Sequence, residues 1–209
     1  MIRAVIFDFG GVIVRTEDQH GRRKWEARLG IPEGALAHTV FGSEAAAHAT
    51  LGRLPESEVW RHVAVTYGLS AEQLKELHSD FWSGDRLDAE LVRFIRSLRP
   101  RYATALLSNA WPDARDAFTQ KFGLADAVDA MIISAEEGVA KPDARIYQIA
   151  AQRLGVRPEQ AVFVDDFVEN VQGAQAAGMQ AIHFQNREQA LSELKVILDH
   201  AAGAAGEDG

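Results

Sequence analysis

The chain begins with Met1–Val14, MIRAVIFDFGGVIV, in which the apolar run Ala4–Phe7 ends at a single aspartate, Asp8. Two adjacent glycines, Gly10 and Gly11, follow almost at once. A short, unbroken apolar run is typical of a strand that is buried on both faces of a parallel sheet. Glycines lack a Cβ atom, so they allow backbone amides to come close to a bound anion. The stretch therefore predicts a strand whose carboxyl end faces a ligand-binding crevice.

Similar short apolar runs recur along the chain, at Ala103–Leu107, Ala130–Ile133, Ala161–Val164 and Ala181–Phe184. Amphipathic segments of helical length lie between and after the later runs, at Pro112–Phe122, Pro142–Leu154, Val168–Ala177 and Glu188–His200. A proline opens two of these segments, where a first helical turn tolerates a missing N–H, and a glycine follows three of them, as helix ends favour. The alternation predicts an α/β fold with a doubly wound parallel sheet.

The alternation is interrupted between about Arg15 and Gly84, where helical patterns occur without a convincing strand. Four helices are expected there, in the segments DQHGRRKWEARLG, EGALAHTVFG, PESEVWRHVAVTYG and SAEQLKELHSDFW. Inserts at the carboxyl ends of parallel strands lie over the region where such folds bind ligands. We therefore expect a core domain of residues 1–14 and 87–200, an all-helical cap domain of residues 15–86, and a flexible tail of residues 201–209.

The composition argues against several classes of function. The 209 residues carry a net charge of −8 with a sequence pI near 5.4, which argues against nucleic acid or an anionic membrane as the main partner. The chain has no cysteine, so disulfides, thiolate catalysis and cysteine zinc sites are excluded. No apolar stretch reaches membrane-spanning length, and the first run is too short for a secretory signal. We expect a cytoplasmic protein, present as a monomer or a homodimer.

Polar side chains occur where several of the predicted strands end. Asp8 follows the first strand, Ser108 and Asn109 end the second, and the pair Asp165–Asp166 ends a later one. Lys141 is expected at the start of a helix, in GVAKPDARIY. The carboxyl ends of parallel strands meet at one edge of the sheet. The pattern therefore predicts carboxylates, a hydroxyl, an amide and an ammonium around one crevice.

Taken in order, the motifs FDFGGV, SN, KPD and VDD followed by NVQGAQAAGM resemble those of haloacid dehalogenase-like (HAD) superfamily hydrolases. The resemblance covers the chain apart from its tail, and it is closest to the branch of small sugar-phosphate phosphatases with a helical cap of the C1 type. It implies a Mg²⁺-dependent phosphatase that hydrolyses small phosphorylated metabolites, sugar phosphates first. Such enzymes use an aspartyl-phosphate intermediate, which divides one difficult step into two easier ones.

The resemblance also implies which residues handle the phosphoryl group. Asp8 would be the nucleophile, and Lys141 would cancel charge between the nucleophile and the phosphate. Ser108 would hydrogen-bond a phosphoryl oxygen, with Asn109 beside it, and the backbone of Gly11 would approach the anion. These residues are expected to form the catalytic and substrate-binding group.

Metal and cap contacts are implied in the same way. Mg²⁺ prefers oxygen ligands, which Asp8, Asp166 and the backbone carbonyl of Gly10 would supply. Asp165 would assist, either by contacting the residues that bind the metal or by holding a water molecule that binds it. Arg53, in the cap segment LGRLPESEVW, either reaches the substrate or lies in a solvated turn.

The sequence departs from the family pattern at two positions. Gly10 stands where related phosphatases usually carry a second aspartate that acts as general acid and base, a role worth about 10²–10⁴-fold in rate. Three explanations are open. The substrate has a good leaving group, as an acyl phosphate does, and needs little protonation; a cap residue such as Glu17, Asp18 or His20 replaces the aspartate; or the protein is a weak catalyst. Asn170 stands where many relatives have a further aspartate.

Two other functions stay open on the sequence alone. A 2-haloacid dehalogenase would use the same aspartate, serine and lysine on carbon without a metal, and Arg15 or Arg53 would then bind the halide. The carboxylates of Asp165 and Asp166 disfavour this alternative, because they would repel a carboxylate substrate. A non-catalytic ligand-binding protein of the same fold is the second alternative.

Other conspicuous side chains are expected to be structural. Tyr147 is predicted to lie in the core, and the four tryptophans are predicted to pack within the domains. Trp111 is a candidate wall of the pocket because it closely follows Ser108 and Asn109. The seven histidines show no metal-ligand spacing.

Overall fold

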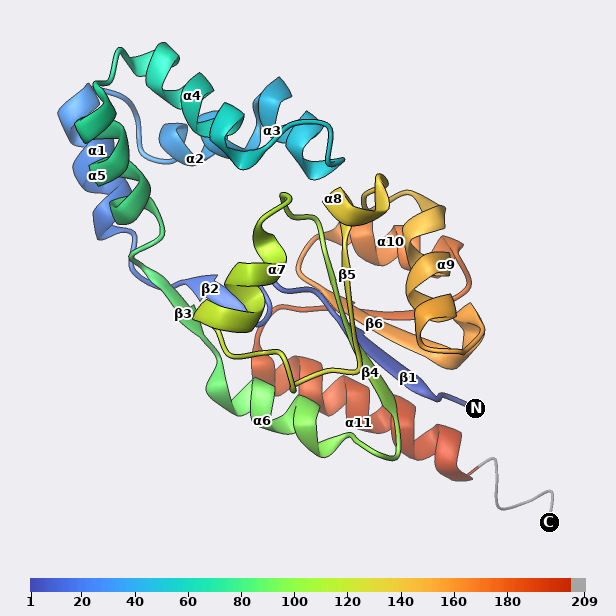
Figure 1. Cartoon of the computed structure of the whole chain (residues 1–209). Helices are drawn as coiled ribbons and strands as arrows, with labels where there is room; N and C mark the ends of the chain where they lie inside the picture. Colours follow the sequence, from blue (N-terminus) through green and yellow to red (C-terminus); the bar gives the residue numbers. More distant parts are fainter. Residues whose placement is uncertain (204–209) are drawn as a thin grey trace.

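The computed structural model describes residues 1–203. Its centre is a five-stranded sheet in the order β5-β4-β1-β6-β7, in which all neighbouring strands are parallel (Figure 1). The strands are β1 (Ala4–Phe7), β4 (Ala103–Ser108), β5 (Ala130–Ile133), β6 (Ala161–Asp165) and β7 (Gln180–His183). The predicted doubly wound parallel sheet is confirmed, and every predicted apolar run coincides with one of these strands within a residue or two.

Helices cover both faces of this sheet. One face carries α6 (Ala89–Ser97) and α11 (Arg187–Gly203), and the other carries α9 (Ala144–Arg153) and α10 (Val168–Ala176) (Figure 1). Alternate residues of a strand point to opposite faces. Val5 and Phe7 therefore join one core, whereas Ala4 and Ile6 join the other. Burying a large apolar side chain stabilises a fold by about 1.5–3 kcal/mol, so strands that are covered on both sides have unbroken apolar runs.

Two predicted helices begin later than the sequence analysis expected. The segment from Pro112 forms a short helix, α7 (Ala114–Asp116), which continues as a π-helical stretch over Ala117–Lys121. Helix α9 begins after Asp143, whose side chain accepts a hydrogen bond from the N–H of Arg145 at 2.9 Å. The prediction that Lys141 begins a helix was wrong. Lys141 lies in the loop between α8 (Ser134–Glu137) and α9, since a residue that precedes proline disfavours helical geometry.

A two-stranded antiparallel ribbon, β2 (Val14–Thr16) and β3 (Asp85–Leu87), joins the sheet to the inserted segment. The sequence predicts no strand between residues 15 and 84, and it does not reveal this ribbon because strands of three residues are too short for an alternating pattern. Two segments of the chain approach closely beside this ribbon: a Cβ added to Gly84 would lie 1.7 Å from the carbonyl oxygen of Asp18. Only a glycine allows this crossing.

Asp88 anchors the ribbon to the core. Its buried carboxylate accepts hydrogen bonds from Arg15 (2.9 Å), from Arg187 at the start of α11 (2.8 Å) and from the backbone N–H of Leu91 (2.9 Å). Burial alone would raise the pKa of Asp88, but these donors outweigh it and lower the pKa to about 2. The charged carboxylate therefore holds three segments together at neutral pH.

The segment between β2 and β3 forms a helical unit with its own hydrophobic core. Its helices are α1 (His20–Leu29), α2 (Ala35–Phe41), α3 (Glu44–Thr50), α4 (Glu56–Tyr67) and α5 (Ala71–Phe81) (Figure 1). The fully buried Trp25, Val59, Leu77 and Phe81 lie in this core. The expected four helices omitted α3, whose sequence EAAAHAT is short and rich in alanine and so lacks a clear apolar stripe.

The C-terminal helix is longer than predicted. Helix α11 continues through Gly203, beyond the expected end at His200 and into the expected tail. Residues 204–209 of that tail lie outside the described residues. No helix within residues 1–203 combines the length and the apolar character needed to cross a membrane.

Candidate active site

Strands β1, β4 and β6 are neighbours, and their carboxyl ends bring together side chains that are far apart in the sequence. The ammonium of Lys141 lies 2.7 Å from Asp8 Oδ1 and 2.6 Å from Asp165 Oδ2, and it donates to the carbonyl oxygen of Leu107 at 3.0 Å. The side chain of Lys141 is 1% exposed and that of Asp165 is 0% exposed. We call Asp8, Lys141 and Asp165 the buried ionic cluster.

The electrostatics of this cluster follow from burial. Two carboxylates share one ammonium, so the three charges leave a net negative charge in a place with little water. Burial raises the pKa of Asp8 to about 7, Lys141 opposes this rise and Asp165 adds to it. A buried unpaired charge is costly, so the cluster favours a cation or a proton as an additional partner.

The loop that carries Lys141 is held by Asn109. The Asn109 amide accepts a hydrogen bond from the Lys141 backbone N–H and donates one to the Lys141 carbonyl, both at 2.9 Å. These two bonds fix the backbone from which the ammonium extends. Ser108, at the end of β4, is buried opposite Ile133 of β5.

Asp165 is saturated by donors. One oxygen accepts the backbone N–H of Phe167 at 2.8 Å, and the amide of Asn170 lies 3.0 and 3.2 Å from its two oxygens. The carbonyl oxygen of Asn170 in turn accepts the hydroxyl of Tyr147 at 2.7 Å. Tyr147 is fully buried in the core beneath α9, as predicted. These contacts favour Asp165 as the group that orients Lys141.

The donor set at this edge suits a hard cation. Asp8, Asp165 and Asp166 each offer a carboxylate oxygen, and these oxygens all lie within 4.8 Å of one another. Asp166 Oδ1 is buried and has no hydrogen-bond partner among the described residues. An orphaned buried carboxylate oxygen beside two further carboxylates is the arrangement that a divalent ion with oxygen ligands would complete.

The two glycines after Asp8 differ in their surroundings. Gly11 has φ +81°, and a Cβ there would lie 2.1 Å from Asp166 Oδ2, so any side chain would displace this carboxylate. Gly10 is exposed, and a Cβ there would meet nothing within 4 Å. Gly11 is therefore required by the position of Asp166, whereas Gly10 leaves room for a side chain.

Other candidate residues are engaged outside the buried ionic cluster. Arg15 is bound to Asp88 and to the carbonyl oxygen of Val12 (2.7 Å), so its guanidinium already has partners. Asp18, in the connection to the helical unit, accepts the backbone N–H of His20 at the start of α1 on Oδ1 at 2.8 Å.

Arg53 is exposed, next to Gly52, in the loop after α3. A Cβ on Gly52 would lie 2.1 Å from the carbonyl oxygen of Ala135, so this loop of the helical unit touches the core at α8. Arg53 therefore stands at the junction between the two parts of the molecule.

One positioning residue escaped the sequence analysis. Ser134 is fully buried, and its hydroxyl lies 3.0 Å from the backbone nitrogen and 3.2 Å from the carbonyl oxygen of Ala110. It thereby ties the end of β5 to the segment that follows Asn109. A polar residue directly after the apolar run Ala130–Ile133 was the signal that would have identified it.

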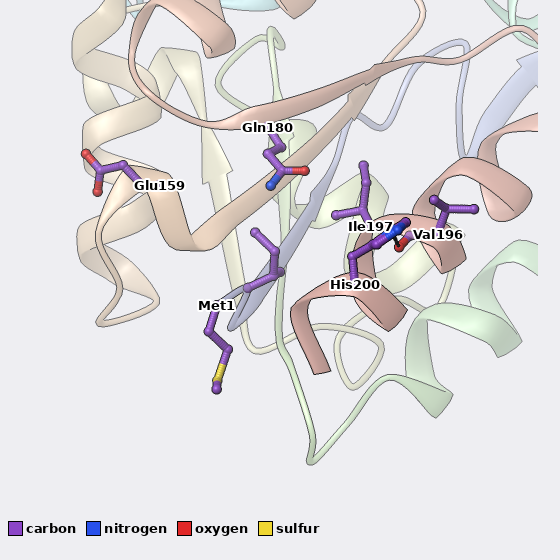
Figure 2. Close-up of a pocket in the computed structure, with 7 residues that line it drawn as sticks. Met1, Glu159, Gln180, Val196, Ile197 and His200 are labelled. Atoms are coloured by element: carbon purple, nitrogen blue, oxygen red, sulfur yellow. Dashed lines mark hydrogen bonds between the residues drawn. The ribbon is translucent and has the colours of Figure 1, made fainter. Parts of the chain in front are cut away.

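The opposite edge of the sheet has a separate pocket. It is lined by Met1, Ile2, Glu159, Gln180, Val196, Ile197 and His200 (Figure 2). These residues lie before or at the starts of β1, β6 and β7 and along α11, whereas Asp8 lies where β1 ends. The pocket is therefore not part of the site around Lys141.

Comparisons with known proteins agree with this arrangement. The family of haloacid dehalogenase-like hydrolases matches residues 2–178. Over 129 residues the chain is 35% identical to the phosphoserine phosphatase of Thermus thermophilus, covering 59% of this chain and 52% of that protein. Over 208 residues it is 25% identical to the D-ribitol-5-phosphate phosphatase of Bacteroides thetaiotaomicron, covering 95% of this chain and 100% of that protein. The chain spans about half or less of the length of the first curated relatives it matches.

Solved structures share the fold. A HAD family enzyme from Bacteroides thetaiotaomicron, whose crystal holds magnesium and inorganic phosphate, superposes with a TM-score of 0.72 at 18% identity, covering 87% of this chain and 93% of that chain. The L-2-haloacid dehalogenase of Xanthobacter autotrophicus superposes with a TM-score of 0.66 at 23% identity, covering 92% and 81%. The fold alone therefore fits both chemistries. The family match covers most of the chain, and the chain belongs to the haloacid dehalogenase-like hydrolases.

Proposed function

We propose that the chain is a Mg²⁺-dependent phosphatase that hydrolyses small phosphorylated metabolites through an aspartyl-phosphate intermediate on Asp8. The observation that carries the proposal is the buried ionic cluster beside Asp166, whose Oδ1 atom is buried without a partner among the described residues. A nucleophilic carboxylate, a fixed ammonium and a free metal-binding oxygen at one edge of the sheet are the parts that phosphoryl transfer needs.

Each residue of the group has a role in this proposal. A carboxylate oxygen of Asp8 attacks phosphorus, the bond from phosphorus to the leaving oxygen breaks, and water later releases inorganic phosphate from Asp8. Lys141, held in place by Asp165 and Asn109, neutralises charge on the nucleophile and the phosphoryl group. Ser108 donates its hydroxyl to a phosphoryl oxygen.

Asp8, Asp166 and the backbone carbonyl of Gly10 would hold the metal ion. Mg²⁺ accepts such oxygen ligands and retains water. Bound there, it would supply positive charge to the phosphoryl oxygens, which phosphatases of this kind require. The hydrogen bonds that Asp165 already accepts favour a role in orienting Lys141.

The missing acid–base side chain at Gly10 restricts the leaving group. A substrate whose leaving oxygen is a weak base departs without protonation, so acyl and anomeric phosphates are the most favourable substrates for this chain. The relatives include a phosphoserine phosphatase and a D-ribitol-5-phosphate phosphatase. The panel of metabolites to test should therefore contain sugar phosphates as well as acyl phosphates.

A 2-haloacid dehalogenase is less well supported. Its substrate is a carboxylate, and the cluster with Asp166 already carries an excess of negative charge. Arg15, one of the two candidate halide-binding residues, is paired with Asp88 at 2.9 Å.

The proposal is tested with acetyl phosphate and p-nitrophenyl phosphate in the presence and absence of Mg²⁺. Turnover that depends on Mg²⁺ and disappears in Asp8→Asn supports the phosphatase. Chloride release from 2-chloropropionate without phosphatase activity would establish the dehalogenase instead. The absence of both activities across a panel of metabolites would leave a ligand-binding protein, and the proposal would be wrong.

A further inference from the structure

We infer that the substrate carries a hydrocarbon chain next to its phosphate, and that this chain packs against an aromatic rim formed by Phe41, Trp82 and Trp111. The inference rests on the proposed function for the chemical step. It concerns the part of the substrate that the phosphoryl site does not hold.

Trp111 connects the rim to the site. It lies two residues after Asn109, whose amide fixes the backbone of Lys141. Its ring centroid is 5.9 Å from that of Phe41 and 6.5 Å from that of Trp82, both in the helical unit. The rim therefore spans the junction between the core and the helical unit, directly after the segment that positions the catalytic lysine.

Phe41 leaves part of the rim open to solvent. It ends α2 and is 50% exposed, although its ring also lies 5.6 Å from Phe81 and 5.9 Å from Trp82. A single exposed aromatic ring is common on protein surfaces. Trp82 and Trp111 are partly buried against the core of the helical unit, so Phe41 extends this apolar cluster to the surface, and exposed apolar surface of this kind is where ligands bind.

A second apolar surface flanks the site from the other side. Phe167 and Val168 follow Asp166 and are 60% and 44% exposed. Because β1 lies between β4 and β6, the segments that carry Trp111 and Phe167 lie on either side of the strand that ends at Asp8. Apolar side chains therefore occur on the segments at both sides of the strand that carries the nucleophile.

The helical unit is in contact with the core beside this junction. Gly52 packs on the carbonyl oxygen of Ala135, and the hydroxyl of the neighbouring Ser134 is bonded to the backbone of Ala110. These two contacts fix the helical unit and the segment before Trp111 to the same part of the core, next to the aromatic rim. A hydrocarbon chain would displace water from these rings, whereas a polyol would place hydroxyl groups against them without partners.

The first test varies chain length at a constant leaving group. Acetyl, butyryl, hexanoyl and octanoyl phosphate all release a carboxylate, so their intrinsic reactivity is nearly the same. We expect kcat/KM to rise about threefold to fourfold for each added methylene until the rim is covered, as burial of a CH₂ group predicts. Phe41→Ser and Phe167→Ser, both at exposed positions, should flatten this dependence. Val196→Ser, at a position 52% exposed in the pocket at the opposite edge (Figure 2), should leave it unchanged.

The second test compares chains of equal length. n-Pentyl phosphate and ribitol 5-phosphate both have five carbons and differ in their hydroxyl groups. Measured as competitive inhibitors of acetyl phosphate hydrolysis, they report binding without requiring an alkyl ester bond to break. We expect pentyl phosphate to bind at least about tenfold more tightly, which a few buried methylenes would provide.

The outcomes separate the two proposals. If the wild-type chain does not hydrolyse acetyl phosphate with Mg²⁺, the proposed function fails. If it does, but kcat/KM is flat along the acyl series, or Phe41→Ser and Phe167→Ser retain the wild-type dependence, the proposed function stands and the hydrocarbon substrate is refuted. Tighter binding of ribitol 5-phosphate would refute it as well.

Discussion

The buried ionic cluster and the aromatic rim lie at the same edge of the sheet, but their surroundings are opposite. Lys141 is 1% exposed and bonded to two carboxylates and a carbonyl oxygen. Phe41 is 50% exposed, and its ring packs near the rings of Phe81, Trp82 and Trp111. The first group leaves little freedom for substitution because the Lys141 ammonium already has three partners, whereas the second can change with the shape of a substrate. In the proposed account, chemistry and specificity would therefore reside in separate parts of this molecule.

The largest effect is expected from breaking the buried ionic cluster. Lys141→Met leaves Asp8 and Asp165 facing each other without a counter-charge. Turnover should fall about 10²–10³-fold, and the free energy of unfolding should fall by about 3–5 kcal/mol, the usual cost of removing one partner of a buried ion pair. Kinetic assays and urea denaturation measure these effects, with the exposed Lys121→Met as control. An unchanged urea midpoint would mean that the lysine is not integral to the cluster.

The next effect concerns the empty space at Gly10. Gly10→Asp should raise turnover of alkyl phosphates up to about a hundredfold, because a general acid would then protonate the leaving oxygen. Acetyl phosphate should show little change, since its leaving carboxylate needs no proton. Gly10→Asn has the same size without the acid and should give no gain. If Gly10→Asp leaves all rates unchanged, another residue already provides the proton.

A smaller effect is expected at Gly11, where an added side chain would strain the backbone and also clash with Asp166. Gly11→Ala should raise the Mg²⁺ concentration for half-maximal activity at least about tenfold, because its Cβ would lie 2.1 Å from Asp166 Oδ2. Gly30→Ala is the matched control, since Gly30 also has a positive φ but a Cβ there would meet nothing within 4 Å. Equal metal dependence in both variants would show that Asp166 is not a ligand.

The smallest effect on catalysis is expected at the ribbon. Asp88→Asn should lower the free energy of unfolding at pH 7 by about 2 kcal/mol while kcat changes little, because Asp88 contacts no residue of the site. The lowered pKa of about 2 means that the ionised carboxylate stabilises the fold above pH 4. The contribution is lost as the pH falls from about 4 through about 2. The stability difference between wild type and variant should shrink over that interval, and a constant difference would contradict the ionic role.

The parallel sheet could be predicted because its strands are buried on both faces. Strands β1, β4, β5 and β6 are mostly buried and mostly apolar, with Thr104 as a buried exception, whereas β7 at the edge of the sheet is partly exposed and contains His183. The four polar motifs were also readable, since each follows an apolar run or lies near Pro142. The structure places Lys141 in a loop, not at a helix start, but the side chain still reaches Asp8 from there.

Other features left no pattern in the sequence. The ribbon β2–β3 consists of three-residue strands, and α3 is a short run of mostly small residues. Asp88 binds Arg15 and Arg187, which are distant in the chain, and a local pattern does not reveal such partners. The aromatic rim combines Phe41, Trp82 and Trp111 from three segments, and only the packing of the helical unit on the core brings them together.

The nucleophilic role of Asp8 is tested most directly by trapping the phosphorylated enzyme. The protein would be mixed with acetyl phosphate and Mg²⁺, quenched with borohydride, which reduces an aspartyl phosphate to homoserine, and digested with trypsin. The peptide Ala4–Arg15, AVIFDFGGVIVR, contains Asp8 as its sole carboxylate side chain, so a modification there identifies the residue without ambiguity. We predict homoserine at position 8 in the wild type. Continued turnover with an unmodified Ala4–Arg15 peptide, or with the modification elsewhere, would contradict the account.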